Sequence, residues 1–179
     1  HDTCRRQRQM CIRDREKASI LLEKGAKWSH SPFELAQNVD ILFSIVGYPE
    51  DVKEIFLGED GALTGMNPGS VAVDFTTGTP SMAKELAYIA KDNQVSILDA
   101  PVSGGDIGAK NAKLSIMVGG DQSAFDTILP LLNHLGTNIL YQGEAGAGQH
   151  TKMCNQTVIA GTMIGMCEAL MYGATSGLD

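Results

Sequence analysis

The sequence is short of several features that mark common classes of site. It has no complete G-x-G-x-x-G run and no C-x-x-C pair, and its N-terminus carries no apolar leader segment. Its four cysteines, at positions 4, 11, 154 and 167, stand at no metal-ligand spacing, and His30, His134 and His150 have no carboxylate or cysteine at such a spacing. We therefore assign no metal and no secretion signal, and we expect reduced thiols in a cytoplasmic protein.

The sequence also lacks an excess of positive charge. Its 14 Lys and Arg against 21 Asp and Glu give a formal net charge of −7, which argues against nucleic acid or an anionic membrane as partner. The first 15 residues differ, because they hold five arginines and only two acidic residues. A basic nucleic-acid arm is one interpretation. The text RRQRQMCIRDR also resembles translated sequencing-adapter sequence, so we expect residues 1–15 to be a non-native or disordered extension.

From Glu16 onward, short apolar runs alternate with amphipathic segments. This alternation predicts an α/β fold with a mostly parallel sheet. The run from Asp40 to Val46 is continuous enough to suggest a strand buried on both faces. Further strands are expected at 70–75, 95–100, 114–118 and 138–141, with helices from 31 and at 49–57, 80–90 and 122–135, and loops at 61–68 and 101–105.

Residues 150 to about 175 predict one long helix that is apolar on most sides. Its length would suit a membrane span. Gln156, Glu168 and several threonines and glycines argue against that alternative, so we expect the first, buried helix of a second, all-α domain and no membrane contact.

Polar or glycine-rich segments follow three consecutive strands, at 46–49, 74–78 and 99–105. Ligands of doubly wound sheets bind beyond the carboxyl ends of the strands, so these segments are candidate binding loops, although each alone could be a plain turn. Ser103-Gly104-Gly105 could offer a hydroxyl and backbone N–H groups to a carboxylate. For Asp121 and Asp99 the simplest prediction is local helix capping.

Lys152 follows Gly146-Ala-Gly148 at the start of the long helix. The positive end of the helix dipole, together with any apolar surroundings, would lower the pKa of its ammonium and suit it to proton transfer. A solvated lysine is the alternative. Gly146 and Gly148 are not read as a dinucleotide loop, because Thr151 stands where a third glycine or alanine belongs.

Taken together, these stretches resemble the β-hydroxyacid dehydrogenases, typified by 3-hydroxyisobutyrate dehydrogenase and tartronate semialdehyde reductase. The matching text is Asp99-Ala-Pro-Val-Ser-Gly-Gly105, Leu114-Ser-Ile-Met-Val-Gly-Gly120 and Gly146-x-Gly-x-x-x-Lys152-x-x-Asn155. The resemblance implies an N-terminal Rossmann domain that binds NAD or NADP, an all-α C-terminal domain and a homo-oligomer. It implies Lys152 as catalytic acid/base, and it places the other roles as follows: substrate binding by Ser103, Gly104, Gly105, Asn155 and Gln156, and cofactor binding by Val46, Gly47 and Thr77.

The resemblance also implies that parts are missing, since the family's G-x-G-x-x-G loop would precede Glu16 and most of its helical domain would follow Asp179. We therefore expect an incomplete Rossmann-like domain at 16–148, the first helix of the second domain at 149–179, and no activity of the fragment alone. Gln156 stands where the family often has asparagine. The expected reaction interconverts a small 3-hydroxy acid and its 3-oxo acid. A glyoxylate or succinic semialdehyde reductase and a non-catalytic binding domain remain alternatives.

Overall fold

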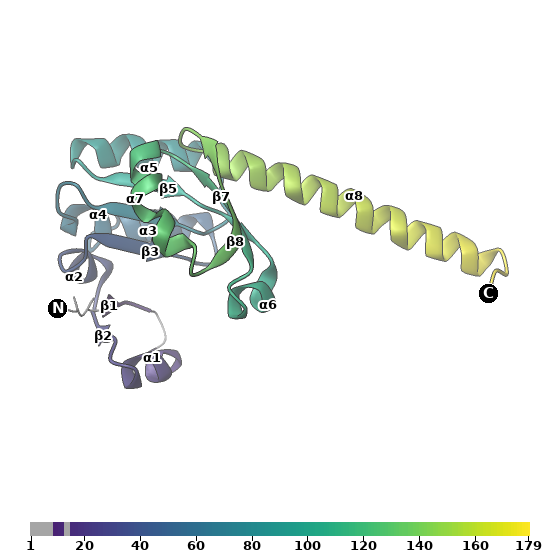
Figure 1. The fold of residues 1–179 in the computed structure, drawn as a ribbon, viewed down its shortest axis with the longest axis horizontal. Helices are drawn as coiled ribbons and strands as arrows, with labels where there is room; N and C mark the ends of the chain where they lie inside the picture. The colour runs from purple at the N-terminus through teal and green to yellow at the C-terminus, as the bar shows by residue number, and fades with distance from the viewer. Residues whose placement is uncertain (1–8, 13–14) are drawn as a thin grey trace.

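The structure is a computed structural model that describes residues 9–12 and 15–179. Its central part is a layered α/β unit, from which one long helix projects (Figure 1). The elements in chain order are β1 (Gln9–Met10), the 3-10 helix η1 (Arg15–Ala18), α1 (Ser19–Glu23), β2 (Lys27–Trp28), α2 (Pro32–Ala36), β3 (Ile41–Ser44), α3 (Pro49–Leu57), α4 (Ala62–Gly65), β4 (Val71–Asp74), α5 (Pro80–Asp92), β5 (Ser96–Asp99), β6 (Val102–Ser103), α6 (Gly105–Lys110), β7 (Leu114–Gly119), α7 (Gln122–Leu132), β8 (Gly136–Gly143) and α8 (Ala147–Thr175).

The main sheet has six strands and is mixed in direction. Strands β3, β4 and β5 pair in parallel, and β8 pairs in parallel with β7. Strand β7 runs antiparallel to both β5 and β6. The prediction of an α/β fold is confirmed, and its mostly parallel sheet is refined to a mixed one because the short β6 turns the chain back beside β7.

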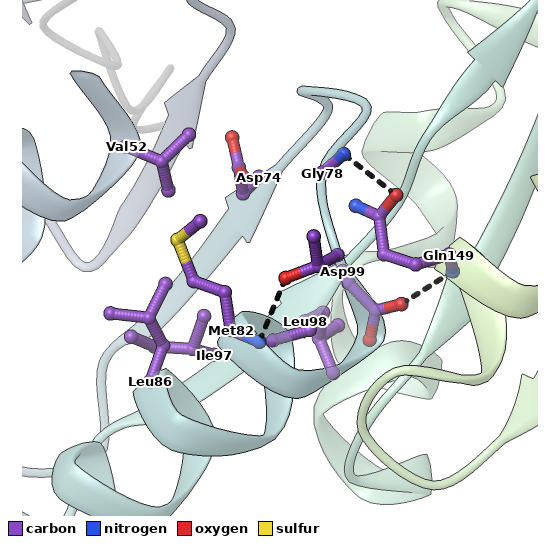
Figure 2. Close-up of a pocket in the computed structure, with 11 residues that line it drawn as sticks. Val52, Asp74, Gly78, Met82, Leu86, Ile97, Leu98, Asp99 and Gln149 are labelled. Atoms are coloured by element: carbon purple, nitrogen blue, oxygen red, sulfur yellow. Dashed lines mark hydrogen bonds between the residues drawn. The ribbon is translucent and has the colours of Figure 1, made fainter. Parts of the chain in front are cut away.

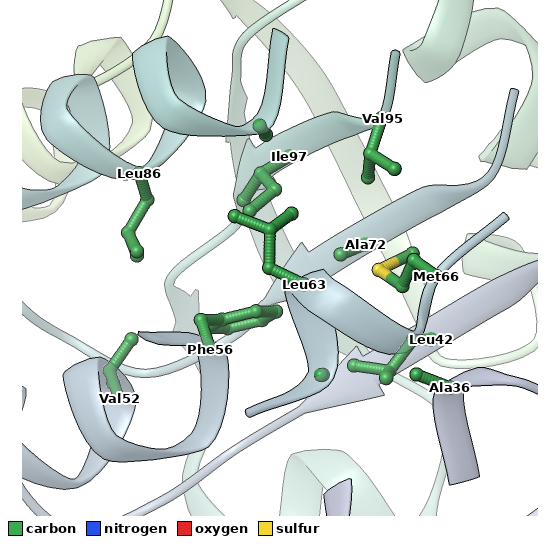
Figure 3. Packing of buried hydrophobic residues seen from close by; sticks show 12 residues of the cluster. Ala36, Leu42, Val52, Phe56, Leu63, Met66, Ala72, Leu86, Val95 and Ile97 are labelled. Carbon is green, nitrogen blue, oxygen red and sulfur yellow. The ribbon is translucent and has the colours of Figure 1, made fainter. Parts of the chain in front are cut away.

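Side chains alternate between the two faces of the sheet, as the strand geometry requires. One face is covered by helices α2 to α5, and its buried cluster, drawn in Figure 3, includes Phe56, Leu63 and Leu86. The other face is covered by α7, with Leu98 and Ile128 fully buried there. Burial of apolar surface on both faces, at about 25 cal/mol per Å², fixes the sheet and hence the positions of its strand ends.

Local signals predicted several helix starts correctly. Ser31 caps α2 by accepting a hydrogen bond from the Glu34 backbone N–H, and Asp121 caps α7 in the same way through Ala124. The predicted loop at 61–68 was wrong, because it contains α4, whose Ala62 and Leu63 are buried in the core. The predicted loop at 101–105 contains β6 and the start of α6.

The expectation that the 40–46 strand is buried on both faces was also wrong. Strand β3 stands at the end of the six-stranded order, and Phe43 is 43% exposed and Ile45 68% exposed in the described part of the chain. The Phe43 ring packs against Phe75, with their centroids 5.5 Å apart. An apolar run therefore did not distinguish an edge strand from a central one.

Within the segment expected to lie outside the fold, Gln9 and Met10 form β1, which pairs in parallel with β2. The Met10 carbonyl also accepts a hydrogen bond from the Ser29 backbone N–H at 2.9 Å. Residues 1–8 and 13–14 of that segment lie outside the described residues. Its foreign origin stays a prediction.

Helix α8 begins three residues before the predicted start and extends away from the sheet (Figure 1). Its first turn is buried, but beyond Asn155 its side chains are largely exposed, including Val158 at 69% and Met171 at 69%. Nothing in the described chain packs along the outer turns, so burial of this helix within a second, all-α domain stays a prediction. By length and composition α8 would also pass as a membrane span, which is weak evidence on its own.

Candidate active site

A row of polar side chains crosses the carboxyl ends of strands β3, β4 and β5. The strand register places Ser44 beside Asp74 and Asp74 beside Asp99. The Ser44 and Thr76 hydroxyls donate to Asp74 Oδ1 at 2.8 and 2.7 Å. Burial raises the pKa of the Asp74 carboxyl, and these hydrogen bonds offset part of that shift. Ligand-binding loops of α/β sheets leave from such strand ends.

Asp99 holds the first turn of α8. Its Oδ1 accepts a hydrogen bond from Gly146 N at 2.7 Å, and its Oδ2 accepts one from Gln149 N at 2.9 Å. Burial raises the pKa of this carboxyl, and the backbone hydrogen bonds act in the opposite direction. The capping predicted for Asp99 is therefore real but not local, because its partners lie about fifty residues later in the chain.

The glycines before α8 allow a close approach of backbones. A Cβ on Gly148 would overlap the Met117 carbonyl oxygen, and one on Gly146 would lie 2.9 Å from the Pro80 carbonyl oxygen. Gly146 also has a φ of 89°, in the left-handed region that favours glycine. Packing against neighbouring backbone accounts for both glycines.

Lys152 lies in the second turn of α8, and its side chain is half-buried. Its Nζ donates a hydrogen bond to the Val102 carbonyl oxygen at 2.9 Å. Burial lowers the pKa of this ammonium, in the direction expected from the sequence. Val102 immediately precedes Ser103, so the structure brings the predicted acid/base to the segment predicted to bind the substrate carboxylate.

Ser103, Gly104 and Gly105 lie where β6 passes into α6. Ser103 is half-buried, whereas Gly104 and Gly105 are exposed. Both glycines have positive φ values, 133° and 62°. A Cβ on Gly104 would also lie 3.2 Å from Leu114 Cδ2, so a larger residue would be strained there. The exposed backbone beside Ser103 fits the predicted carboxylate-binding role.

Asn155 and Gln156 follow Lys152 on α8, three and four residues on, and so share its side of the helix. The Asn155 Nδ2 donates to Gln156 Oε1 at 3.0 Å. Asn155 is half-buried and Gln156 is exposed. The two amides thus stand next to Lys152, which fits a role in orienting a substrate.

The three residues predicted to line the cofactor gather at the ends of β3 and β4. The Val46 backbone N–H donates to Thr76 Oγ1 at 3.0 Å, which ties the two loops together. Gly47 and Thr77 are both exposed. They offer an accessible edge at the place where α/β sheets bind nucleotides, so these residues fit part of an NAD or NADP site.

Gln149 joins the cofactor-side loop to the helix that carries Lys152, a link the sequence did not reveal. Its Nε2 donates to the Thr76 carbonyl oxygen at 2.8 Å, and its Oε1 accepts from Gly78 N at 2.9 Å. The residue is only 4% exposed. Figure 2 shows this amide facing Gly78, with Asp99 on its other side.

A cavity of about 20 Å³ lies beneath this junction, lined by Asp74, Asp99 and Gln149 together with apolar side chains such as Met82 and Leu86 (Figure 2). It has room for about one water molecule. Among the described residues, the lining includes neither Lys152 nor Ser103. The cavity therefore lies apart from the two residues predicted to act on and bind the substrate.

The residues that sequence reasoning missed are buried connectors. Thr76, Gln149 and Ser44 bind other protein groups, so no exposed motif marks them. One signal was present, since Asp74 and Asp99 each end a predicted strand, where a carboxylate is unusual. No group of three or more His, Cys, Asp or Glu side chains able to hold a metal occurs in the part of the chain that the structure describes.

Comparison with known proteins identifies the class of this fold and site. Residues 5–143 match the model of the NAD binding domain of 6-phosphogluconate dehydrogenase. Residues 146–179 match the model described as NAD-binding of NADP-dependent 3-hydroxyisobutyrate dehydrogenase. The fold is thus an NAD- or NADP-binding α/β fold followed by a long C-terminal helix.

Individual relatives and one solved structure resemble this chain along most of its length. The chain is 48% identical to an uncharacterised oxidoreductase of Bacillus subtilis, over 93% of this chain and 58% of the relative. It is 45% identical to a probable mitochondrial 3-hydroxyisobutyrate dehydrogenase-like protein of Arabidopsis thaliana, over 91% of this chain and 49% of the relative. A solved structure of Mycobacterium tuberculosis 3-hydroxyisobutyrate dehydrogenase with L-serine superposes with a TM-score of 0.86 at 32% identity, covering 93% of this chain and 56% of that one.

The chain belongs to the β-hydroxyacid dehydrogenase family. It spans about half to three fifths of the length of these relatives.

Proposed function

We propose that this chain is part of an NAD(P)-dependent oxidoreductase that interconverts a small 3-hydroxy acid and its 3-oxo acid. One observation carries the proposal: the Lys152 ammonium, with its pKa lowered by burial, lies 2.9 Å from the carbonyl oxygen of the residue before Ser103. A proton donor thereby stands beside a Ser-Gly-Gly segment whose exposed glycines could hold a carboxylate.

The residues of this chain would divide the work as follows. The Ser103 hydroxyl and the backbone N–H groups of Gly104 and Gly105 bind the substrate carboxylate. Asn155 orients the substrate beside Lys152. During reduction the Lys152 ammonium gives a proton to the carbonyl oxygen, and during oxidation the neutral amine takes the hydroxyl proton. Burial lowers the pKa of Lys152, which increases the share of the neutral amine at a given pH.

Val46, Gly47 and Thr77 would line the NAD or NADP site. The cofactor, when bound, supplies or accepts the hydride, so the protein contributes orientation and proton transfer. The 179 residues contain no complete G-x-G-x-x-G loop for a pyrophosphate. We therefore expect little turnover from this chain alone, and a test of the whole reaction needs the remaining family segments.

The substrate class is supported by chemistry common to the relatives. L-serine, present in the Mycobacterium tuberculosis structure, is itself a 3-hydroxy acid with a substituent on C2, as is 3-hydroxyisobutyrate. Glyoxylate and succinic semialdehyde reduction remain the alternative activities. Homo-oligomer formation, the cytoplasmic location and the absence of a membrane partner stay predictions.

The test uses a chimera in which residues 16–179 replace the matching segment of the Bacillus subtilis relative. NAD(P)H absorbance is followed with 3-hydroxyisobutyrate, L-serine, glyoxylate and succinic semialdehyde. Lys152→Met should lower kcat by about 10²–10⁴-fold, the usual contribution of general acid/base catalysis. Lys91→Met, at an exposed lysine on α5, is the matched control and should leave kcat unchanged.

Two outcomes would count against the proposal. Wild-type kcat in Lys152→Met would exclude the proton-transfer role. A folded chimera that binds NADH but turns over none of the acids would favour the non-catalytic binding domain.

A further inference from the structure

Asp99 is enclosed where the end of β5 meets the first turn of α8. Both carboxylate oxygens accept backbone hydrogen bonds from that turn, from Gly146 and from Gln149. On the β7 side, a Cβ on Gly119 would lie only 2.7 Å from Asp99 Oδ1. Asp99 is 4% exposed, so its carboxylate has little freedom to move away from the helix.

The same two segments touch a second time, three residues further along each. Val102 lies three residues after Asp99, and Lys152 lies three residues after Gln149. The first contact is Gln149 N to Asp99 Oδ2 at 2.9 Å, and the second is Lys152 Nζ to the Val102 carbonyl oxygen, also at 2.9 Å. These two hydrogen bonds join the β5–β6 connection to the start of α8 at two successive points. The Asp99 contact therefore lies one helical turn before the Lys152 contact, between the same two segments.

The Gln149 side chain adds a third connection, between the start of α8 and the loop predicted to line the cofactor. Its amide binds the Thr76 carbonyl oxygen and the Gly78 N–H, on either side of Thr77. The loop predicted to line the cofactor is therefore tied to α8 one turn before Lys152. In the part of the chain that the structure describes, no buried side-chain polar atom lacks a hydrogen-bond partner. The oxygen and the nitrogen of the Gln149 amide are accordingly both hydrogen-bonded.

We propose that Asp99 and Gln149 are positioning residues that hold Lys152 against Val102 and Ser103, and at a fixed place relative to the Thr76–Gly78 loop. Neither residue needs to touch the substrate; both act through the first turn of α8. The inference rests on the proposed function, in which Lys152 transfers the proton.

The chain offers a matched control in Asp121. This residue also caps a helix through its carboxylate, accepting from Ala124 N at 2.9 Å at the start of α7. It differs from Asp99 in that the helix it caps carries no predicted site residue. Asp99→Asn and Asp121→Asn are the same isosteric change of a capping carboxylate, so both weaken a cap but only the first should affect Lys152.

The first experiment needs no turnover. The 179-residue chain is prepared with lysine labelled with ¹³C at Cε, its signals are followed by NMR during a pH titration, and Lys152→Arg identifies the Lys152 signal. In Asp99→Asn, a loosened first turn hydrates the ammonium, so the pKa of Lys152 should rise towards the ordinary value of a lysine. Gln149→Met, which keeps the side-chain length but loses both amide hydrogen bonds, should shift it in the same direction. Asp121→Asn should leave it unchanged.

An unchanged Lys152 pKa in the folded variants would overturn the inference. A lower pKa in Asp99→Asn would also overturn it, because loss of a nearby negative charge alone lowers a lysine pKa. If Asp99→Asn fails to give a folded spectrum, Gln149→Met decides alone, and an unchanged titration there refutes the positioning role.

The second experiment measures steady-state kinetics of the same variants in the chimera. Asp99→Asn and Gln149→Met should lower kcat by about 10–100-fold, as expected for a displacement of about 1 Å. KM should stay within about twofold of its wild-type value, because the Ser103–Gly105 segment is unchanged. In the oxidation direction the rise of kcat with pH should move to higher pH.

The two proposals fail separately. If Lys152→Met keeps wild-type kcat, the proposed function is wrong. If Lys152→Met abolishes turnover while Asp99→Asn and Gln149→Met keep wild-type kcat and pH profile, the function stands and the positioning role is wrong.

Discussion

Alanine in place of Gly148 should destabilise the fold strongly. Its Cβ would overlap the Met117 carbonyl oxygen and would lie 2.7 Å from the Asp99 carbonyl oxygen and 2.8 Å from Asp99 Oδ2. These neighbours are backbone atoms and a carboxylate that is hydrogen-bonded on both oxygens, so they cannot swing aside. The start of α8 must shift, or the site must remain overpacked.

The magnitude follows from three contributions. Overpacking costs about 1–3 kcal/mol. Weakening the two hydrogen bonds to the buried Asp99 carboxylate adds about 1.5–3 kcal/mol for each bond that is lost. Alanine returns about 0.5–1 kcal/mol through its better helix propensity. If one of the two bonds is lost, we expect Gly148→Ala to lower the free energy of unfolding by about 1.5–5.5 kcal/mol.

Gly161→Ala is the matched control in the same helix. A Cβ there would meet nothing within 4 Å, so only the helix propensity changes, by about 1 kcal/mol in favour of the helix. Urea unfolding followed by circular dichroism measures Gly148→Ala. Amide hydrogen exchange within α8 measures Gly161→Ala, because the exposed turns can open locally. Equal stability of Gly148→Ala and the wild type would refute the close approach of α8 to β5 and β7.

Three further predictions concern charge, capping and association. Burial raises the pKa of Asp74, so its stabilising contribution is present below its ordinary pKa of 3.8 and is lost as pH rises through the raised value. Urea titrations from about pH 4 to pH 7 should show Asp74→Asn losing less stability than the wild type, and parallel curves would contradict this. Asp121→Ala should cost about 1 kcal/mol in thermal unfolding, because the α7 cap is lost. The exposed residues Ile159 and Met163 should drive concentration-dependent association in sedimentation, and Met163→Glu should weaken it; a strict monomer at high concentration would exclude it.

Elements with signals inside their own segment were predicted well. Helix α3 has the bounds predicted from sequence, because Pro49 occupies its first position and Gly58 follows its end. Asp121 caps α7, as a short polar residue before an apolar helix should. Such features depend on residues within a few positions of one another, so one sequence is sufficient.

Features that depend on distant partners were not predicted. The start of α8 was placed too late, because the carboxylate that caps it belongs to Asp99, 47 residues before Gly146. Gln149 was passed over, since its two side-chain bonds go to a loop more than seventy residues away. Strand β6 has only two residues, too few for any alternation to show.

The sequence indicated which residues form the candidate site, but not the contacts that position them. Lys152 and Ser103 were chosen from a family resemblance, and the structure brings Lys152 to the carbonyl oxygen beside Ser103. The sequence could not indicate that this approach depends on Asp99, because that dependence arises from the packing of α8 against β5 and β7.

In the described chain, helix α8 is held at its N-terminal end only, so a small tilt there would displace its far end by a larger distance. With 29 residues, the helix is roughly 43 Å long, so a tilt of about 5° at its root would carry its tip through about 4 Å. The fixed point of such a tilt would be the start of the helix, held by Asp99, Gln149 and Lys152. A small tilt of the helix beside Lys152 would thus accompany a large displacement of its far end.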